Sequence, residues 1–223
     1  MNKLKNLVQK YMDGNLSPHM DTINNRLKEI YGYETYVQSQ YEDSILSRRD
    51  ESRKDYYPYI PLHPMRFLNV LKSLRLLFGH RESFIDVGCG IGEKVLLAHH
   101  TEMFDKCYGI EYSSYTHDIA KSKIEPIIGS NTIIYGDAFA HDFSTYDTIY
   151  MYCPIQNPDT MLRLLEYIYK TMREDAIIIF FNGSVPCVAN RCQERCIQYL
   201  YSDGAYILYK KPLPFFPKHM EET

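Results

Sequence analysis

The sequence predicts an α/β fold in which helices cover a mostly parallel β-sheet, preceded by a helical extension at the N-terminus. Three observations support this prediction. From residue 83 onward, short apolar runs alternate with segments of helical periodicity. The run at residues 176–181 is apolar on both faces, as a buried central parallel strand requires. Residues 1–55, by contrast, are polar and carry two amphipathic helical stripes.

The extension, which we place at residues 1–55, is expected to begin with two short helices. The first stripe of apolar side chains at helical spacing consists of Leu4, Leu7, Val8, Tyr11 and Met12. Gly14-Asn15 ends this segment, and Ser17-Pro18 is typical of an N-cap followed by the first residue of a helix. The second stripe consists of Met20, Ile23, Leu27 and Ile30. Residues 35–55 fit either a helix or a connector.

A segment rich in tyrosine and proline, residues 56–64, separates the extension from the main domain, which we place at residues 56–223. Its three prolines exclude a helix interior, so we expect an extended segment that enters a helix near Pro64. That helix has an apolar face made of Phe67, Val70, Leu71, Leu74 and Leu77. It also carries a basic stripe, which we define as Arg66, Lys72, Arg75 and Arg81.

The main domain alternates strands and helices along most of its length. Strands are expected at residues 83–87, 107–110, 132–135, 148–152 and 176–181. Helices are expected at residues 92–100, 116–128 and 158–172. The chain then changes pattern, because two β-type runs at residues 196–201 and 205–209 are separated only by Ser202-Asp203-Gly204. This spacing predicts an antiparallel hairpin.

Composition and charge exclude several classes of protein. With 223 residues, 45% of them hydrophobic, the chain is not disordered or collagenous. A net charge of −3 excludes a strongly cationic nucleic-acid binder. We see no signal peptide and no apolar run long enough to span a membrane, so we expect a cytoplasmic protein without membrane contact.

The cysteines and histidines do not form a recognised metal-binding pattern. Cys187, Cys192 and Cys196 have spacings of five and four, which differ from those of zinc sites. His99 and His100 are adjacent and would face different directions on a helix, so we expect exposed or capping roles for them. No metal is therefore predicted.

The strongest local signal is a glycine-rich loop between the first strand and the following helix. The sequence is Phe84-Ile85-Asp86-Val87-Gly88-Cys89-Gly90-Ile91-Gly92. Glycines are required where the backbone turns sharply and a ligand lies against it. In a dinucleotide-binding fingerprint the third glycine would stand at residue 93, which is Glu93 here. The acidic residue just before the loop suits a ligand with a cationic amino group better than a pyrophosphate.

With this motif the sequence resembles the class I S-adenosylmethionine-dependent methyltransferases, whose first motif is D/E-x-G-x-G-x-G. Two further acidic residues carry the resemblance, because Glu111 ends the second expected strand and Asp137 follows the third. The resemblance covers residues 56–223. It implies a Rossmann-like, seven-stranded, mostly parallel sheet with a C-terminal antiparallel hairpin and helices on both faces. It also implies S-adenosylmethionine as cofactor and S-adenosylhomocysteine as product.

The resemblance assigns a role to each motif. Asp86 would act near the cofactor's amino group, Glu111 would accept hydrogen bonds from both ribose hydroxyls, and Asp137 would face the adenine amine. Capping of a helix or turn is the alternative role for Asp86 and Asp137. The full set of expected cofactor-binding residues is Asp86, Gly88, Cys89, Gly90, Gly92, Glu111, Tyr112, Asp137, Ala138 and Cys153.

The methyl acceptor is expected beside the end of the fourth strand. Enzymes of this class that methylate exocyclic amines carry D/N-P-P-Y there, whereas this chain has Cys153-Pro154-Ile155-Gln156, which argues against an amino-adenine acceptor. His63 and Tyr59 are the candidate general bases, if a base is needed. The arrangement of residues 56–64 before the first motif also loosely resembles the Dot1-like protein lysine methyltransferases.

We therefore expect a methyltransferase that acts by in-line displacement on a small molecule or a protein side chain. An RNA acceptor bound by the basic stripe remains an alternative, as does a regulatory subunit that binds the cofactor without catalysis. A nicotinamide-dependent oxidoreductase is a third alternative, to which Glu93 is the main objection.

Overall fold

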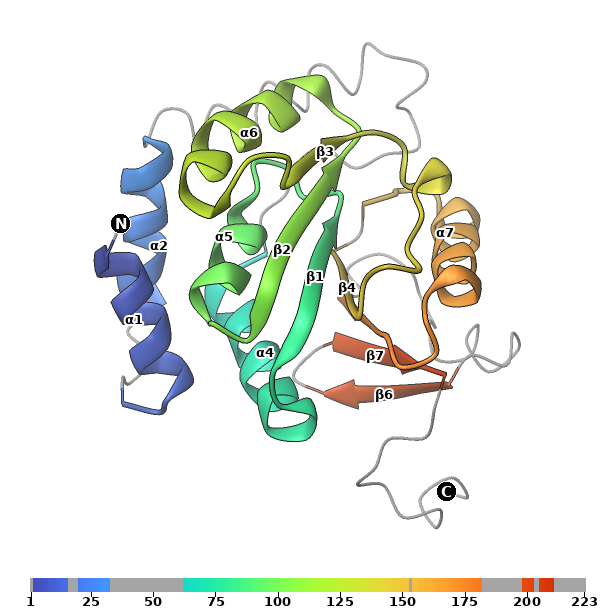
Figure 1. The fold of residues 1–223 in the computed structure, drawn as a ribbon, viewed down its shortest axis with the longest axis horizontal. Helices are drawn as coiled ribbons and strands as arrows, with labels where there is room; N and C mark the ends of the chain where they lie inside the picture. Colours follow the sequence, from blue (N-terminus) through green and yellow to red (C-terminus); the bar gives the residue numbers. More distant parts are fainter. Residues whose placement is uncertain are drawn as a thin grey trace.

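A seven-stranded sheet forms the centre of the computed structural model, which describes residues 2–15, 20–32, 62–152, 154–181, 198–202 and 205–210. The strand order is β3-β2-β1-β4-β5-β7-β6 (Figure 1). The strands are β1 Arg81–Val87, β2 Phe104–Glu111, β3 Ile133–Tyr135, β4 Thr148–Tyr152, β5 Ile177–Phe181, β6 Gln198–Ser202 and β7 Ala205–Tyr209. The first five pair in parallel, whereas β7 is antiparallel to β5 and β6 is antiparallel to β7. The predicted α/β architecture with a C-terminal antiparallel pair is confirmed.

Helices lie on both faces of this sheet, as predicted. The helices of the main domain are α4 Pro64–Phe78, α5 Glu93–His100, α6 Ser114–Ile128 and α7 Pro158–Thr171. Apolar side chains of α4, α5 and α6 pack with Phe84 and Cys107 in one core cluster. Those of α7 pack with Ile85 and Ile110 in a second cluster. Because neighbouring strand residues point to opposite faces, the two clusters lie on opposite sides of the sheet.

The two N-terminal helices, α1 Asn2–Met12 and α2 Met20–Tyr31, add an outer layer beside α5 and α4 (Figure 1). Their buried side chains, which include Leu4, Val8, Ile23 and Leu27, belong to the same core cluster as those of α4 and α5. Lys5 of α1 also forms a salt bridge of 2.7 Å with Glu102, just after α5. Burial of these apolar stripes is what holds such short helices in place, since they would be marginal alone.

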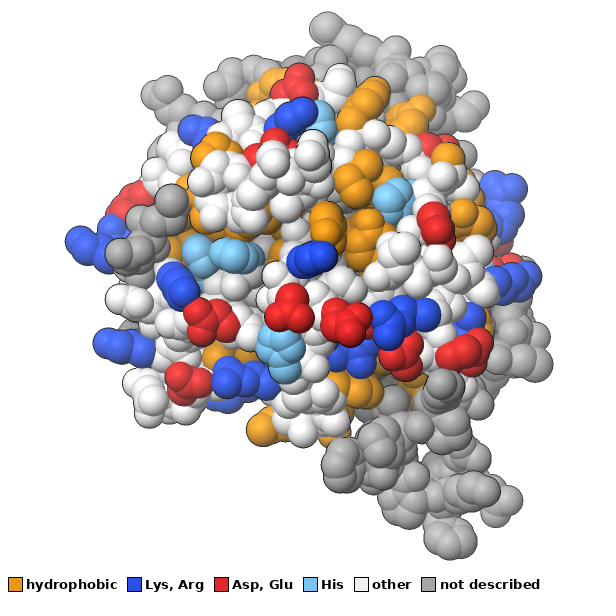
Figure 2. Space-filling view, viewed as in Figure 1, with side chains coloured by type: hydrophobic (Ala, Val, Ile, Leu, Met, Phe, Trp, Pro, Cys, Tyr) orange, Lys and Arg blue, Asp and Glu red, His pale blue; other side chains and the backbone are white. Residues whose placement is uncertain are grey.

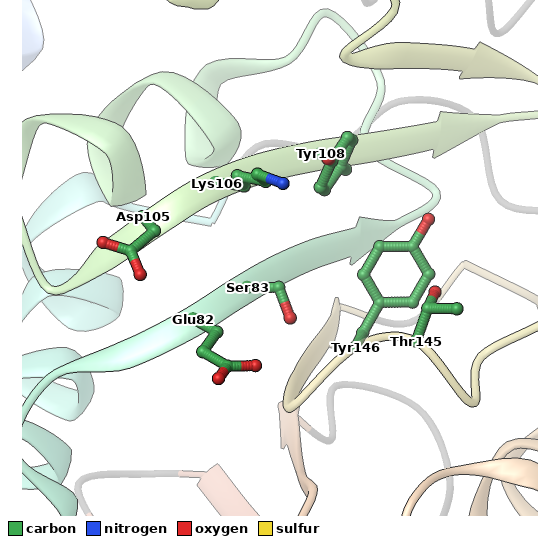
Figure 3. Close-up of a pocket in the computed structure, with 7 residues that line it drawn as sticks. All are labelled: Glu82, Ser83, Asp105, Lys106, Tyr108, Thr145 and Tyr146. Carbon is green, nitrogen blue, oxygen red and sulfur yellow. The ribbon is translucent and has the colours of Figure 1, made fainter.

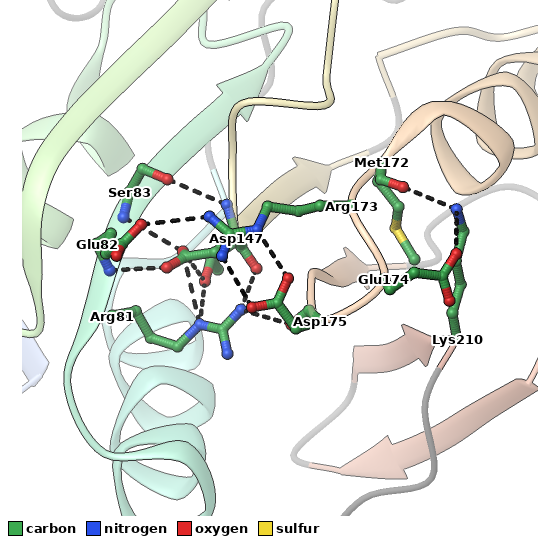
Figure 4. A network of polar contacts seen from close by, with 10 residues as sticks. Arg81, Glu82, Ser83, Asp147, Met172, Arg173, Glu174, Asp175 and Lys210 are labelled. Carbon is green, nitrogen blue, oxygen red and sulfur yellow. Dashed lines mark hydrogen bonds and ion pairs between the residues drawn. The ribbon is translucent and has the colours of Figure 1, made fainter.

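The amino end of the sheet is held by a polar network around Asp147 (Figure 4). Its carboxylate accepts the backbone N–H groups of Glu82 and Ser83, at 2.7 and 3.3 Å. Arg81 donates to the hydroxyl of Thr148 and to the backbone carbonyl of Asp175. These long-range contacts extend β1 to Arg81, two residues before the start that the apolar pattern predicts.

Charged side chains are mixed on the face drawn in Figure 2, where acidic and basic groups alternate across the lower half. This face therefore presents no broad area of one sign. Among the residues that the structure describes, no helix combines the length and the hydrophobicity that a membrane span requires.

Candidate functional site

The candidate site lies at the carboxyl edge of the parallel strands, around the glycine loop, residues 88–92, that joins β1 to α5. Asp86 is the penultimate residue of β1, and Glu111 is the last residue of β2. Asp137 follows β3 by two residues. Since β3, β2 and β1 are adjacent and parallel, the sheet brings the ends of these strands to one edge. Crevices outside this edge are the usual ligand sites of open α/β sheets.

Glu111 connects the end of β2 to the glycine loop. Its Oε2 accepts the backbone N–H of Gly90 at 2.7 Å, and its Oε1 accepts that of Ser113 at 2.8 Å. The same strand end receives the loop backbone, because the N–H groups of Gly88 and Cys89 both donate to the carbonyl of Ile110. Carboxylate oxygens can accept more than one hydrogen bond each, which suits Glu111 to a ligand with hydroxyl groups.

Asp86 is a buried carboxyl at the base of the loop, with only 3% of its surface exposed. Among the described residues, none forms a hydrogen bond with its carboxyl group. Burial raises the pKa of Asp86 from 3.8 to about 8; Lys94 opposes this shift, and the nearby Glu111 and Glu93 add to it. A buried carboxyl without a donor favours a cationic ligand, whose charge would compensate for the lost hydration.

An ion pair that the sequence reasoning did not anticipate lies at the start of α5. Lys94 Nζ is 2.5 Å from Glu93 Oε1, and the two residues are only 6% and 1% exposed. The signal that could have revealed it is the presence of two adjacent charges at the start of an otherwise apolar helix. Buried charges are rare unless paired, so this pair belongs to the electrostatics of the site.

Two of the three loop glycines are required by contacts within the protein. Gly88 has φ +74°, and a Cβ there would lie 2.7 Å from Cβ of Pro154. Gly92 has φ +81°, and a Cβ there would lie 2.8 Å from Cγ1 of Ile124 on α6. These glycines therefore allow the loop to pack against the segment after β4 and against α6. This packing would require glycine at both positions even without a ligand.

Cys89 is a buried side chain that packs against β2. A Cβ on Gly109 would lie 2.7 Å from Cys89 Sγ, so β2 needs a glycine at that position. Burial raises the pKa of the Cys89 thiol well above its ordinary range, with added effects from Glu111 and Asp86. The thiol is therefore neutral, and its contact with Gly109 is a packing contact.

The residues expected near the adenine are more exposed. Asp137 is exposed, and its Oδ1 accepts the backbone N–H of Phe139 at 2.9 Å, which caps the short 3₁₀ helix Ala138–Ala140. The capping role considered as the alternative for Asp137 is thus present. Tyr112 and Ala138 are both half-buried.

The expected acceptor corner lies at the ends of β4 and β5. Tyr152 and Phe181 are paired across these strands, with ring centroids 6.4 Å apart. The guanidinium of Arg66 lies 5.7 Å from the centroid of the Phe181 ring. His63 caps α4, because its Nδ1 accepts the backbone N–H of Met65 at 3.3 Å. Two expected site residues, Tyr59 and Cys153, lie outside the described residues.

Most of the basic stripe is engaged by the protein itself. Lys72 donates to the backbone carbonyl of Tyr11 and lies 5.1 Å from the centroid of its ring. Arg75 forms a 3.4 Å contact with Asp13, and Arg81 belongs to the network around Asp147. Lys72, Arg75 and Arg81 therefore hold α1 and the amino end of the sheet. Arg66 is the exposed member of the stripe at the carboxyl edge.

A cavity of about 480 Å³ lies at the other end of the sheet (Figure 3). Its lining residues are Glu82, Ser83, Asp105, Lys106, Tyr108, Thr145 and Tyr146. These residues come from the amino-terminal and middle parts of β1 and β2 and from the segment before β4 (Figure 3). The cavity contains none of the expected site residues.

His100 differs from the sequence expectation. Instead of being exposed or capping, it is only 3% exposed, and neither ring nitrogen has a hydrogen-bond partner among the residues that the structure describes. The reason is that α5 is covered on several sides, by the sheet, α4, α6 and α1. Within the described residues, no group of three or more His, Cys, Asp or Glu side chains could hold a metal ion.

Comparison with known proteins identifies solved structures of similar architecture. No protein-family model matches the sequence, and a search of curated proteins gave no match. Among solved structures, a ribosomal protein L11 methylase from Lactobacillus delbrueckii subsp. bulgaricus superposes with a TM-score of 0.50 at 16% identity, over 65% of this chain and 77% of that one. An RNA methyltransferase from Salinibacter ruber in complex with S-adenosyl-L-homocysteine superposes with a TM-score of 0.47 at 15% sequence identity, over 72% of this chain and 97% of that one. An amino pentose methyltransferase from Micromonospora echinaspora superposes with a TM-score of 0.45 at 15% sequence identity, over 63% of this chain and 55% of that one. The chain has the Rossmann-like fold of the class I S-adenosylmethionine-dependent methyltransferases.

Proposed function

We propose that this protein is an S-adenosylmethionine-dependent methyltransferase. The observation that carries the proposal is the arrangement of Asp86, Glu111 and Gly90 at one edge of a sheet with this fold. Glu111 holds the glycine loop through Gly90, while Asp86 is buried at the base of the loop and receives no hydrogen bond from the described residues. A carboxylate at the end of β2 and a buried carboxyl at the end of β1 are suited to a ligand with a ribose diol and an ammonium group.

The residues present fit this cofactor in three respects. The carboxylate of Glu111, at the end of β2, is an acceptor suited to a ribose diol. Asp86 offers a buried carboxyl group to the amino group. Asp137, which is exposed and uses one oxygen as a cap, can accept from an exocyclic amine with the other.

A pyrophosphate-containing nicotinamide cofactor fits this loop poorly. Its pyrophosphate would have to lie at the amino end of α5, where helix dipoles favour anions. Here Glu93 is the first residue of that helix, and Asp86 and Glu111 lie behind it. The carboxylates of Glu93 and Glu111 would repel a pyrophosphate, and Lys94 is already paired with Glu93.

S-adenosylmethionine, when bound, supplies an electrophilic methyl group. The protein's own contribution to such a reaction is to orient the acceptor and to exclude water at the ends of β4 and β5. His63 would have to give up its bond to the Met65 N–H before its Nδ1 could accept a proton, so its Nε2 is the better candidate for that role.

We favour a small molecule or a protein side chain as acceptor over RNA. Three of the four stripe residues are held by contacts within the chain, which leaves Arg66 alone at the carboxyl edge. RNA binding without sequence contacts depends on several phosphate-neutralising side chains. Within the basic stripe, one arginine alone provides too little charge for it.

Calorimetric titration tests the cofactor. We expect S-adenosylhomocysteine to bind and NAD not to bind. Glu111→Ala should weaken S-adenosylhomocysteine binding more than tenfold, or about 1.4 kcal/mol. Asp105→Ala, an exposed change at the opposite end of β2, is the matched control and should leave binding unchanged. NAD binding in place of S-adenosylhomocysteine would overturn the proposal.

Transfer of labelled methyl groups from S-adenosylmethionine tests catalysis and the acceptor. Cell extract is divided into small-molecule, protein and RNA fractions, and each is incubated with the protein. We expect label in the small-molecule or the protein fraction. Label in RNA would favour the RNA alternative, whereas binding without transfer to any fraction would favour a regulatory subunit.

A further inference from the structure

We infer that Lys94 is the internal counter-ion of the loop carboxyl groups, and that a ligand ammonium group at the loop displaces a proton from Asp86 when it binds. The inference rests on the proposed function, because it concerns the amino group of the same cofactor. It concerns four residues, which we call the loop charge cluster: Asp86, Glu93, Lys94 and Glu111.

The first step of the argument is the position of Lys94. It is the second residue of α5, directly behind the glycine loop, and only 6% of its surface is exposed. Its ammonium group is bound to Glu93 at 2.5 Å, and it also acts electrostatically on Asp86. A lysine is seldom buried at this depth unless neighbouring carboxylates compensate for its charge.

The second step is the balance of charge in the cluster. It contains one cation and three carboxyl groups, so one lysine cannot neutralise all of them. Glu93 is paired with Lys94, and Glu111 accepts two backbone N–H groups. Asp86 has neither an ion pair nor a hydrogen bond from the described residues, and it is 3% exposed. It is therefore the member of the cluster that holds a proton.

The third step concerns every described group that faces Asp86. These groups are Glu93 and Lys94 on α5, Glu111 on β2, the neutral thiol of Cys89 in the loop, and Tyr150, which is aligned with Asp86 on β4. The only cation among them is Lys94. Burial, with Glu111 and Glu93, keeps the pKa of Asp86 at about 8 despite Lys94.

Binding of an ammonium group changes this balance. The neutral carboxyl of Asp86 and the ligand's ammonium become a carboxylate–ammonium pair, and one proton goes to the buffer. The pair is stronger than a contact between ammonium and neutral acid, because the charges attract in a partly desolvated site. The ligand keeps its own proton, so the proton released comes from the protein.

The number of protons released can be measured by titrating S-adenosylhomocysteine in buffers of different ionisation enthalpy. With a free-state pKa of about 8, we expect nearly one proton per ligand at pH 7, about half at pH 8 and ~0.1 at pH 9. 5′-Methylthioadenosine, which lacks the amino-acid part, should bind with no proton release. Binding of S-adenosylhomocysteine with no proton release at pH 7 would overturn the inference and leave the proposed function intact. Failure of S-adenosylhomocysteine to bind would overturn both.

Variants separate Lys94 from a merely structural role. Lys94→Met should move the midpoint of proton release to higher pH, because the counter-ion that favours the Asp86 carboxylate is lost. Lys94→Arg should keep the midpoint near that of the wild type, and Asp86→Asn should release no proton at any pH. An unchanged midpoint in a folded Lys94→Met variant would exclude Lys94 as counter-ion. If Lys94→Met does not fold, the pH series on the wild type and on Lys94→Arg still decides the matter.

Discussion

The backbone N–H of Gly90 donates to Oε2 of Glu111 across 2.7 Å, and this bond holds the glycine loop after β1 against the end of β2. Together with the bond from the Ser113 N–H to Oε1, it makes Glu111 a structural part of the loop as well as a proposed ligand for ribose. One side chain therefore couples the stability of the loop to cofactor binding.

Glu111→Gln should destabilise the protein by about 1–3 kcal/mol, because one carboxylate oxygen becomes an NH₂ donor that faces a backbone N–H. Urea unfolding measures the change. Glu125→Gln is the matched control, since the carboxyl of Glu125 accepts the N–H of Ile133 only at 3.5 Å, and its loss should cost less than about 0.5 kcal/mol. An unfolding midpoint unchanged from the wild type in Glu111→Gln would show that these two bonds contribute little.

Gly92→Ala should destabilise the protein by about 2–4 kcal/mol. The new Cβ would lie 2.8 Å from Ile124 Cγ1, in a fully buried site, and φ of +81° adds backbone strain. A double-mutant cycle with Ile124→Ala separates the two effects, because that change removes the clashing carbon. We expect the cost of Gly92→Ala to fall by 1 kcal/mol or more in the Ile124→Ala background, or about fivefold in the folding constant. Equal costs in both backgrounds would mean that strain alone matters.

The sequence predicts the architecture well where the pattern is local. The strand at residues 148–152 and the hairpin strand at residues 205–209 have the expected bounds, because apolar alternation and turn residues define them. The starts of β1 and β2 are earlier than predicted, at Arg81 and Phe104. For β1 the cause is Asp147, which holds the first residues of the strand from 65 positions away in the sequence.

The positions of the candidate site residues follow from the sequence better than their contacts do. The spacing of acidic residues along the strands places Asp86 and Glu111 at one edge, as found. The packing role of Gly88 depends on Pro154, and the burial of Lys94 depends on the helices and strands that pack around α5. Such contacts join residues far apart in the chain, and no local pattern encodes them.

Asp86→Asn should change how stability depends on pH. The pKa of Asp86 is about 8 in the folded protein and near 3.8 when unfolded, so the folded state binds a proton that the unfolded state does not. The bound proton stabilises the folded protein relative to the unfolded chain. This stabilisation increases by about 2–3 kcal/mol as the pH falls from 9 to 6. Urea unfolding of the wild type and of Asp86→Asn at pH 6 and pH 9 measures it. We expect the variant to gain stability relative to the wild type at pH 9. A difference between the two proteins that is the same at both pH values would contradict the assignment.

His100 should produce the opposite dependence on pH. Burial, with the nearby His99 and Lys5, lowers the pKa of His100 from 6.5 to about 4. The unfolded chain therefore binds a proton at a pH at which the folded protein does not, and stability is lost as the pH falls from 6.5 towards 4. At pH 5 the loss attributable to His100 is about 2 kcal/mol.

His100→Leu isolates this effect, because it keeps an apolar side chain under α1 and removes the titrating ring. Urea unfolding at pH 7.5 and pH 5 should show a smaller loss of stability in the variant than in the wild type, by the same 2 kcal/mol or so. His99→Gln, at a half-buried position on the same helix, is the control and should retain most of the wild-type loss of stability.

Protonation of His100 should first loosen α1, because α1 packs against α5 and its Lys5 forms an ion pair with Glu102, just after the end of α5. Hydrogen exchange at pH 5 should therefore increase in α1 before it increases in the sheet, and in His100→Leu this difference should disappear. Equal exchange in α1 and the sheet of the wild type would place the acid-sensitive group elsewhere.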